Sequence, residues 1–121
     1  MNAKQYFFDA LVFDYVDFLK NIKGLSENTA KAYKRDLSKL SKFLESFAIE
    51  GLESITEEIC SAWVANLFQS NVSARSIQRH ISSAKGFFNY LKKISLVQSS
   101  PFELINSPKS PNYLPNILSP E

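Results

Sequence analysis

The sequence predicts an all-α fold, a small bundle of four or five helices followed by a proline-rich connector. Apolar residues recur at spacings of three and four in two long segments, which is the period of an amphipathic helix. No proline interrupts the first 100 residues, where it would break a helix. The prolines come later, at Pro101, Pro108, Pro111, Pro115 and Pro120. We therefore expect a helical domain over residues 1–100 and an extended linker over residues 101–121.

The length and the cysteine content fit a protein of the cytoplasm. A chain of 121 residues can bury a modest core without disulfides or a metal. Its single cysteine, Cys60, cannot form an intramolecular disulfide, which is typical of a reducing compartment. No signal peptide is apparent. Asp9, Asp14 and Asp17 exclude a transmembrane span from the aromatic first segment, because a span needs about 20 largely apolar residues. We expect a soluble cytoplasmic protein that does not bind a membrane.

The first two predicted helices cover residues 4–22 and 26–47. The first has an apolar stripe wider than one core contact needs, and Gly24 ends it. The second begins with Ser26 as its N-cap. Its apolar side carries Ala30, Tyr33, Leu37, Leu40 and Leu44, and its other side carries Lys31, Lys34, Arg35, Lys39 and Lys42. We expect the second helix to pack on one side and to expose positive charge on the other.

Two further helices are predicted after a loop that begins at Gly51. Thr56 caps the third, to about Gln69, with Cys60 and Trp63 as core residues. Ser73 caps the fourth, to about Lys93. The fourth helix has an apolar side with Ile77, Ile81, Ala84, Phe88 and Leu91, and another side with Arg75, Arg79, Ser82 and Gly86, with Lys85 beside them.

The fourth predicted helix also carries a row of small residues, Ser82, Ser83 and Gly86. Small side chains let a helix lie close against a bulky partner. The sequence leaves open whether that partner is the groove of a DNA duplex or another helix.

Charge is sorted along the chain in a way that favours binding to a phosphate backbone. Residues 71–100 hold five bases and no acid, which gives +5, and residues 23–45 hold six bases and three acids, which gives +3. Residues 46–70 between them hold four acids and no base. A near-neutral protein that places its positive charge on two separate segments has the pattern of a nucleic-acid binder. The alternative is a helical protein-interaction module whose basic faces are simply solvated.

The sequence contains no convincing catalytic or metal-binding pattern. His80 is the only histidine, so we expect a surface or packing residue rather than a zinc ligand. Cys60 lies on an apolar stripe in an acidic segment, which does not favour a nucleophile. Glu57 and Glu58 point about 100° apart on a helix and do not form a paired acid–base site. We expect no enzyme activity from this chain alone, and no metal, cofactor or small-molecule ligand.

Two segments and the connector contain distinctive runs of residues. The first segment contains Leu25-Ser26-Glu27-Asn28-Thr29 and Ala32-Tyr33-Lys34-Arg35-Asp36-Leu37. The second runs from Ser73 to Leu91, with Arg79, Ile81-Ser82, Lys85 and Phe87-Phe88-Asn89-Tyr90-Leu91. The connector contains Pro101, Ser107-Pro108-Lys109, Leu114-Pro115 and Leu118-Ser119. In order and spacing these runs specifically resemble the core-binding domain of Xer-type tyrosine recombinases, in the phage integrase family.

The resemblance implies a SAM-like helical bundle that clamps duplex DNA together with a catalytic domain absent from this sequence. Helices matching residues 26–47 and 73–93 would face the DNA. It implies DNA contacts by Thr29, Lys34 and Arg35 on one helix and by Arg79, Ser82 and Lys85 on the other. Our predicted DNA-binding set also includes Lys31, Arg75 and Ser76.

The resemblance also implies that the full-length protein is a recombinase enzyme whose strand exchange takes place in a synaptic tetramer. We expect double-stranded DNA and other recombinase protomers as its partners. The aromatic first helix would either be buried in the core or contact a neighbouring protomer. The target sequence cannot be read from these residues, nor can the choice between chromosome-dimer resolution and mobile-element integration.

Overall fold

The computed structural model describes residues 3–105, and within them the chain forms helices without a β-strand. The elements are α1 (Ala3–Asn21), α2 (Glu27–Leu44), the 3-10 helix η1 (Leu52–Ser54), α3 (Glu57–Gln69) and α4 (Ala74–Lys93). The predicted all-α fold with four helices is confirmed. Most of the predicted linker falls on residues 106–121, which lie outside the described residues.

The helix boundaries follow local chemistry. The predicted caps are confirmed: the side-chain oxygens of Ser26, Thr56 and Ser73 each accept a backbone N–H three residues later, at 3.2 Å. Gly24, just after α1, has a φ of 72°, which glycine adopts without strain. α2 ends at Leu44 rather than at residue 47, because the following turn makes tighter bonds, such as Phe47 N–H to the Leu44 carbonyl.

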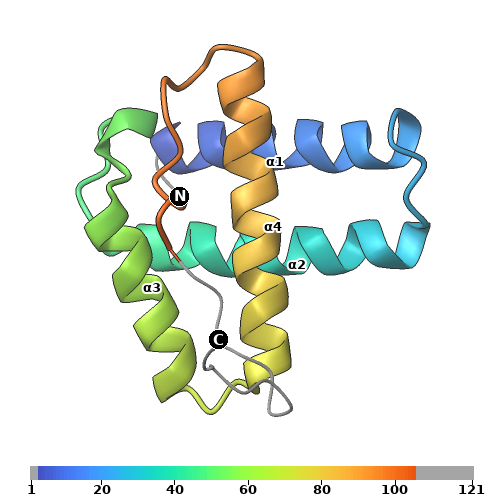
Figure 1. Ribbon diagram of the computed structural model, residues 1–121. Coiled ribbons are helices and arrows are strands. Elements are labelled where there is room, and N and C mark those ends of the chain that lie inside the picture. The colour runs from blue at the N-terminus through green and yellow to red at the C-terminus, as the bar shows by residue number, and fades with distance from the viewer. Residues whose placement is uncertain (1–2, 106–121) are drawn as a thin grey trace, which may run out of the picture.

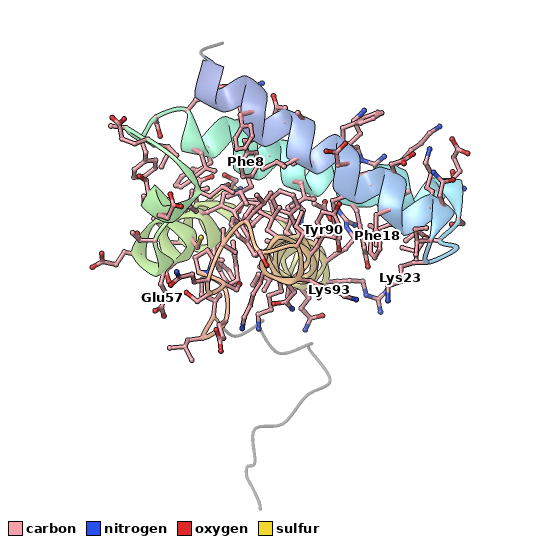
Figure 2. All side chains as sticks on the ribbon, turned by 90° about the horizontal axis from the view of Figure 1, so that it is seen from above. Phe8, Phe18, Lys23, Glu57, Tyr90 and Lys93 are labelled. Atoms are coloured by element: carbon pink, nitrogen blue, oxygen red, sulfur yellow. The ribbon has the colours of Figure 1, made fainter. Side chains whose placement is uncertain are left out.

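The helices form two layers. α1 and α2 run side by side in opposite directions, and α4 crosses both of them (Figure 1). Seen from above, α3 and α4 form a second layer against the α1–α2 pair (Figure 2). The chain after α4 turns back and passes between α3 and α4 (Figure 1). The two predicted basic helices, α2 and α4, therefore meet at a crossing.

Aromatic side chains fill the space between the layers. Phe87 of α4 packs edge-on against Phe8 of α1, with ring centroids 5.4 Å apart. The ring centroid of Phe102, from the segment after α4, lies 5.7 Å from that of Phe88 and 6.0 Å from that of Trp63. Phe102 is fully buried, so the packed unit continues past residue 100, where the sequence suggests the domain boundary.

Gly86 marks a close approach between α4 and α1. A Cβ atom added at this position would lie 2.4 Å from the hydroxyl oxygen of Tyr15, but 3.6 Å from its ring carbon Cζ. Tyr15 is buried and is flanked by the rings of Phe18, Phe87 and Tyr90, so it has little room to move away. The absence of a side chain at Gly86 is therefore a packing requirement of the α1–α4 contact.

Gly86→Ala is expected to destabilise the fold by about 1–2 kcal/mol, because overpacking outweighs the better helix propensity of alanine. In a Tyr15→Phe background the clashing oxygen is gone, and the same substitution should be neutral or stabilising. Urea unfolding of the two single variants and the double variant measures both values. An equal loss in the two backgrounds would contradict the assigned contact.

Two buried acidic groups link stability to alkaline pH. Burial raises the pKa of the Cys60 thiol to about 12, with Glu57 as a smaller cause. Burial also raises the pKa of the Tyr15 hydroxyl to about 12, with Tyr33 as the smaller cause. The folded chain keeps these protons above the ordinary values of 9.0 and 10.0, at which the unfolded chain releases them. Their contribution to stability is therefore complete below pH 9 and is lost as the pH rises toward 12.

We expect the free energy of unfolding to fall between about pH 9 and pH 11 and to fall less steeply in Cys60→Ala, which lacks the thiol. Urea titrations of both proteins across this range give the two slopes. Identical slopes would show that Cys60 does not carry a raised pKa in the folded state.

Candidate nucleic-acid interface

A buried carboxylate lies where α2 meets α4. Asp36 of α2 has a side chain only 1% exposed, and it faces Arg79 of α4. Asp36 Oδ2 accepts from Arg79 Nε–H at 2.9 Å, and Oδ1 accepts from Nη2–H at 2.9 Å. Two parallel bonds between a guanidinium and a carboxylate are the strongest geometry of such a pair. Asp36 and Arg79 thus join the two predicted basic helices.

Two further α4 residues surround this carboxylate. Ser83 Oγ–H donates to Asp36 Oδ2 at 3.0 Å, and Ser83 is fully buried. His80 Nε2 lies 3.5 Å from Asp36 Oδ1, which is beyond good hydrogen-bond distance. The other ring nitrogen, Nδ1, is hydrogen-bonded to the Ser76 carbonyl, which can only accept, so Nδ1 carries the proton. His80 is buried against Trp63 and is therefore a packing residue, one of the two roles that the sequence predicts.

The Arg79 side chain is fixed at one edge and open at the other. Of its five N–H donors, Nε–H and one Nη2–H bind Asp36, which leaves three on the Nη1 and Nη2 edge. The side chain is 42% exposed. The hydrogen bond to Asp36 raises the pKa of Arg79, so the guanidinium stays charged. This outer edge is a fork that can donate to two acceptors at once.

The α4 site residues form an exposed row. Arg75, Arg79 and Ser82 follow one another at intervals of four and three, which places them on one side of the helix, and all three are exposed. We call these three residues the α4 row. Lys85 is half-buried beside it. Ser76 is half-buried, and its carbonyl is bonded to His80 rather than turned to solvent.

The α2 site residues are divided between two sides of the helix. Thr29 precedes Asp36 by seven residues, so both lie on the side toward α4, although the Thr29 hydroxyl accepts from Ser26. Lys31 and Lys34 instead line a groove between α1 and α2, together with Asp17. Arg35 is exposed. The structure therefore places Thr29 on the Arg79 side of α2 and Lys31 and Lys34 on the α1 side.

The small residues of α4 differ in their surroundings: two of them contact other helices, and one is exposed. Ser83 bonds Asp36 of α2, and Gly86 lies against Tyr15 of α1. For these two residues the close partner is another helix, which is one of the alternatives that the sequence left open. Ser82 alone is exposed.

The sequence analysis did not single out Asp36 or Ser83 as parts of a site. The usable signal was the position of Asp36, which is three residues after Tyr33 and four before Leu40 and so lies at the edge of the apolar seam. An acid so placed needs a cationic or hydrogen-bonding partner. The sequence could not show that this partner lies 43 residues later, on α4.

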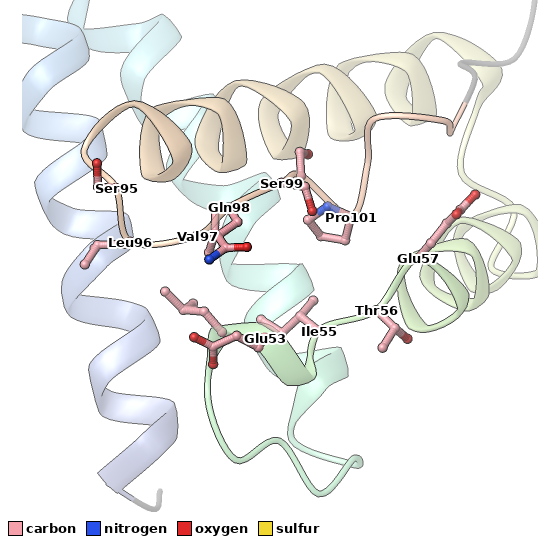
Figure 3. A pocket seen from close by; sticks show the side chains of 12 residues that line it. Glu53, Ile55, Thr56, Glu57, Ser95, Leu96, Val97, Gln98, Ser99 and Pro101 are labelled. Atoms are coloured by element: carbon pink, nitrogen blue, oxygen red, sulfur yellow. The ribbon is translucent and has the colours of Figure 1, made fainter.

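Other parts of the described chain offer less to an anion. A pocket between η1 and the segment after α4 is lined by two acids, Glu53 and Glu57, and by no base (Figure 3). Within residues 3–105 no cluster of three or more histidine, cysteine or acidic side chains could hold a metal ion. No helix among the same residues has the length and apolar character needed to cross a bilayer.

The helical part of the chain matches a known protein family. The family model of the phage integrase N-terminal SAM-like domain matches residues 12–94, which include the whole of α2, α3 and α4 and part of α1. The chain belongs to this family. The match includes both Asp36 and the α4 row.

Several curated relatives of the chain are tyrosine recombinases. It is 31% identical over 113 residues to the tyrosine recombinase XerD of Staphylococcus haemolyticus, covering 93% of this chain and 38% of that protein. It is 33% identical over 117 residues to XerD of Shewanella oneidensis, covering 97% of this chain and 39% of that protein. It is 30% identical to XerC of Anoxybacillus flavithermus, covering 88% of this chain and 36% of that protein. The chain thus spans less than two fifths of these relatives. No solved structure matches significantly.

Ser83→Ala is expected to destabilise the integrase-type domain by about 1–3 kcal/mol, because it removes a buried hydrogen bond to a charged group. The matched control is Ser82→Ala, which makes the same chemical change one residue earlier at an exposed position. Thermal or urea unfolding measures both variants. Equal stability of the two would argue that the Ser83–Asp36 bond contributes nothing.

Proposed function

We propose that this chain binds duplex DNA as one half of the clamp of a site-specific tyrosine recombinase. The observation that carries the proposal is the α4 row, which places two exposed arginines on one side of a helix. The segment that contains this helix, residues 71–100, holds no acid. Arg75 and the open edge of Arg79 would contact phosphates or bases, and Ser82 offers a short hydroxyl next to Arg79. Membership in the integrase family and the names of the relatives support this function.

On the α2 side, Thr29 and Arg35 are the residues we propose to contact the same duplex. Thr29 lies on the side of α2 that carries Asp36, and Arg35 is exposed on the adjoining surface. Lys31 and Lys34 lie beside α1 and would reach only phosphates that pass along that flank. Lys85, half-buried beside the α4 row, would contact the backbone rather than a base.

We further propose that strand exchange requires residues of the full-length recombinase that lie outside this chain. The chain spans less than two fifths of its relatives, and its matched part is an N-terminal domain. The exposed aromatic residues of α1 favour a contact between protomers: Phe7 is 51% exposed and Phe13 is 62% exposed. In this proposal α1 combines the two predicted roles, since Phe8 and Tyr15 are buried while Phe7 and Phe13 are free for a neighbour.

DNA binding should be strongly salt-dependent. If roughly five to seven phosphates are contacted, a plot of log K against log salt should have a slope of about −4 to −6. Fluorescence anisotropy with a labelled duplex of about 30 base pairs, at several salt concentrations, measures this slope. Arg75→Ala should weaken binding and reduce the slope by about 1, as expected for one lost phosphate contact.

The control for this experiment is Lys42→Ala, which also removes one positive charge from the surface. Lys42 lies near the C-terminal end of α2, in a groove with Asp9 and Glu45, and is not part of the proposed interface. Its loss should leave the slope unchanged. Absence of binding at low salt, or an equal effect of the two substitutions, would contradict the proposal and favour a protein-interaction module with solvated basic faces.

A further inference from the structure

We propose that Asp36 is a positioning residue for DNA recognition, which holds Arg79 so that its Nη1–Nη2 edge meets a pair of acceptors on the DNA. The acceptors would be O6 and N7 of a guanine or two oxygens of a phosphate. This inference rests on the proposed DNA-binding function and adds a buried residue that touches no DNA itself.

The geometry of the pair supports the role of Asp36 as a positioning residue. The Asp36 carboxylate is anchored in the interior of the domain, at 1% exposure, and receives a third hydrogen bond from Ser83. It binds the inner edge of the guanidinium through Nε and Nη2. In a planar group with five donors, this leaves the end-on fork directed away from the carboxylate. The outer N–H groups of Arg79 are therefore exposed at the surface, while Asp36 holds the inner edge of the guanidinium in place.

Fixing this side chain in advance favours binding. A free arginine on a helix surface samples many rotamers, and ordering such a side chain on binding costs conformational entropy. Arg79 is already ordered by two bonds to a buried group, although its side chain remains 42% exposed. Arg75, on the same row, has no such partner among the described ion pairs. It therefore serves for comparison as an arginine that no carboxylate holds in place.

Stability gives a weaker account of the same pair. Where α3 and α4 meet, apolar rings fill the contact, namely Trp63, Phe88 and Phe102. Burying a carboxylate instead carries a desolvation penalty that an ion pair often fails to recover. The presence of Asp36 at this crossing is therefore better explained by its orienting effect on Arg79 than by a contribution to the stability of the fold.

The decisive variant is Asp36→Asn, because a charge effect and a positioning effect predict opposite changes in DNA affinity. The substitution removes one negative charge beside the interface, so electrostatics alone predicts tighter DNA binding. The amide also places a donor where the carboxylate accepted, so it cannot bind both Nε–H and Nη2–H. Positioning therefore predicts weaker binding, by roughly tenfold, which is the scale of a lost bidentate contact.

The test is a double-variant cycle in the 121-residue chain, by anisotropy with a mixed-sequence duplex of about 30 base pairs. Arg79→Lys keeps the charge but lacks the fork, and should also weaken binding roughly tenfold. In the Arg79→Lys background, Asp36→Asn should cause no further loss. Binding by Asp36→Asn that matches or exceeds that of the unsubstituted chain overturns the inference, as does an equal loss in both backgrounds.

A second variant covers the case in which Asp36→Asn does not fold. Ser83→Ala removes one bond to the Asp36 carboxylate and leaves the arginine pair in place. It should weaken binding by about two- to threefold in the unsubstituted chain and not at all beside Arg79→Lys. Circular dichroism checks that each variant used is helical. A Ser83→Ala effect that persists in the Arg79→Lys background overturns the inference.

A duplex with 7-deazaguanine in place of guanine separates the two acceptor sources. Loss of affinity for this duplex by the unsubstituted chain, but not by Arg79→Lys, identifies a guanine edge; no loss identifies phosphate.

Failure of the wider proposal is distinguishable from failure of this inference. No salt-linked binding by the unsubstituted chain rejects DNA binding itself, whereas salt-linked binding unaffected by Asp36→Asn rejects only the role of Asp36.

Discussion

The arrangement of this domain depends on one buried carboxylate. Asp36 lies at the α2–α4 crossing, and a charge in that position must be met by cationic and hydroxyl groups or it would destabilise the fold. Arg79 and Ser83 meet it, both from α4. Because the bonds run between two helices, they fix how α4 lies across α2. The same bonds fix which edge of Arg79 remains at the surface.

The crossing also requires small side chains. Ser83 is short enough for α4 to approach α2, and Gly86 admits the Tyr15 hydroxyl of α1. Gly86 continues the line of the exposed Arg75, Arg79 and Ser82 along α4, and Ser83 adjoins that line. Packing and surface chemistry are therefore not independent, since the residues that bring the helices together also set the orientation of the exposed row. This coupling is the physical basis for treating α2 and α4 as one interface.

The sequence predicts local features of this domain well and distant pairings poorly. Ser26, Thr56 and Ser73 act within a single turn, so their capping roles could be predicted from adjacent residues. The sorting of charge into α2 and α4 could be counted directly. The partnership of Asp36 with Arg79 joins residues far apart in the chain, and no local period encodes it. For the same reason, the sequence could not show that Lys31 and Lys34 lie on the α1 side of α2 or that Phe102 packs between α3 and α4.

The central claim is that Arg79 is held in place before DNA arrives. Nitrogen-15 NMR of the arginine guanidinium groups in the 121-residue chain tests it most directly, because rotation about the guanidinium bonds averages the Nη signals of a free arginine. We predict separate Nη1 and Nη2 signals for Arg79 without DNA, and averaged signals for the exposed Arg75. On addition of duplex DNA, Nη1 of Arg79 should shift while Nε–H keeps its position. Averaged Arg79 signals in the free chain, or a large shift of Nε–H on binding, would contradict the account.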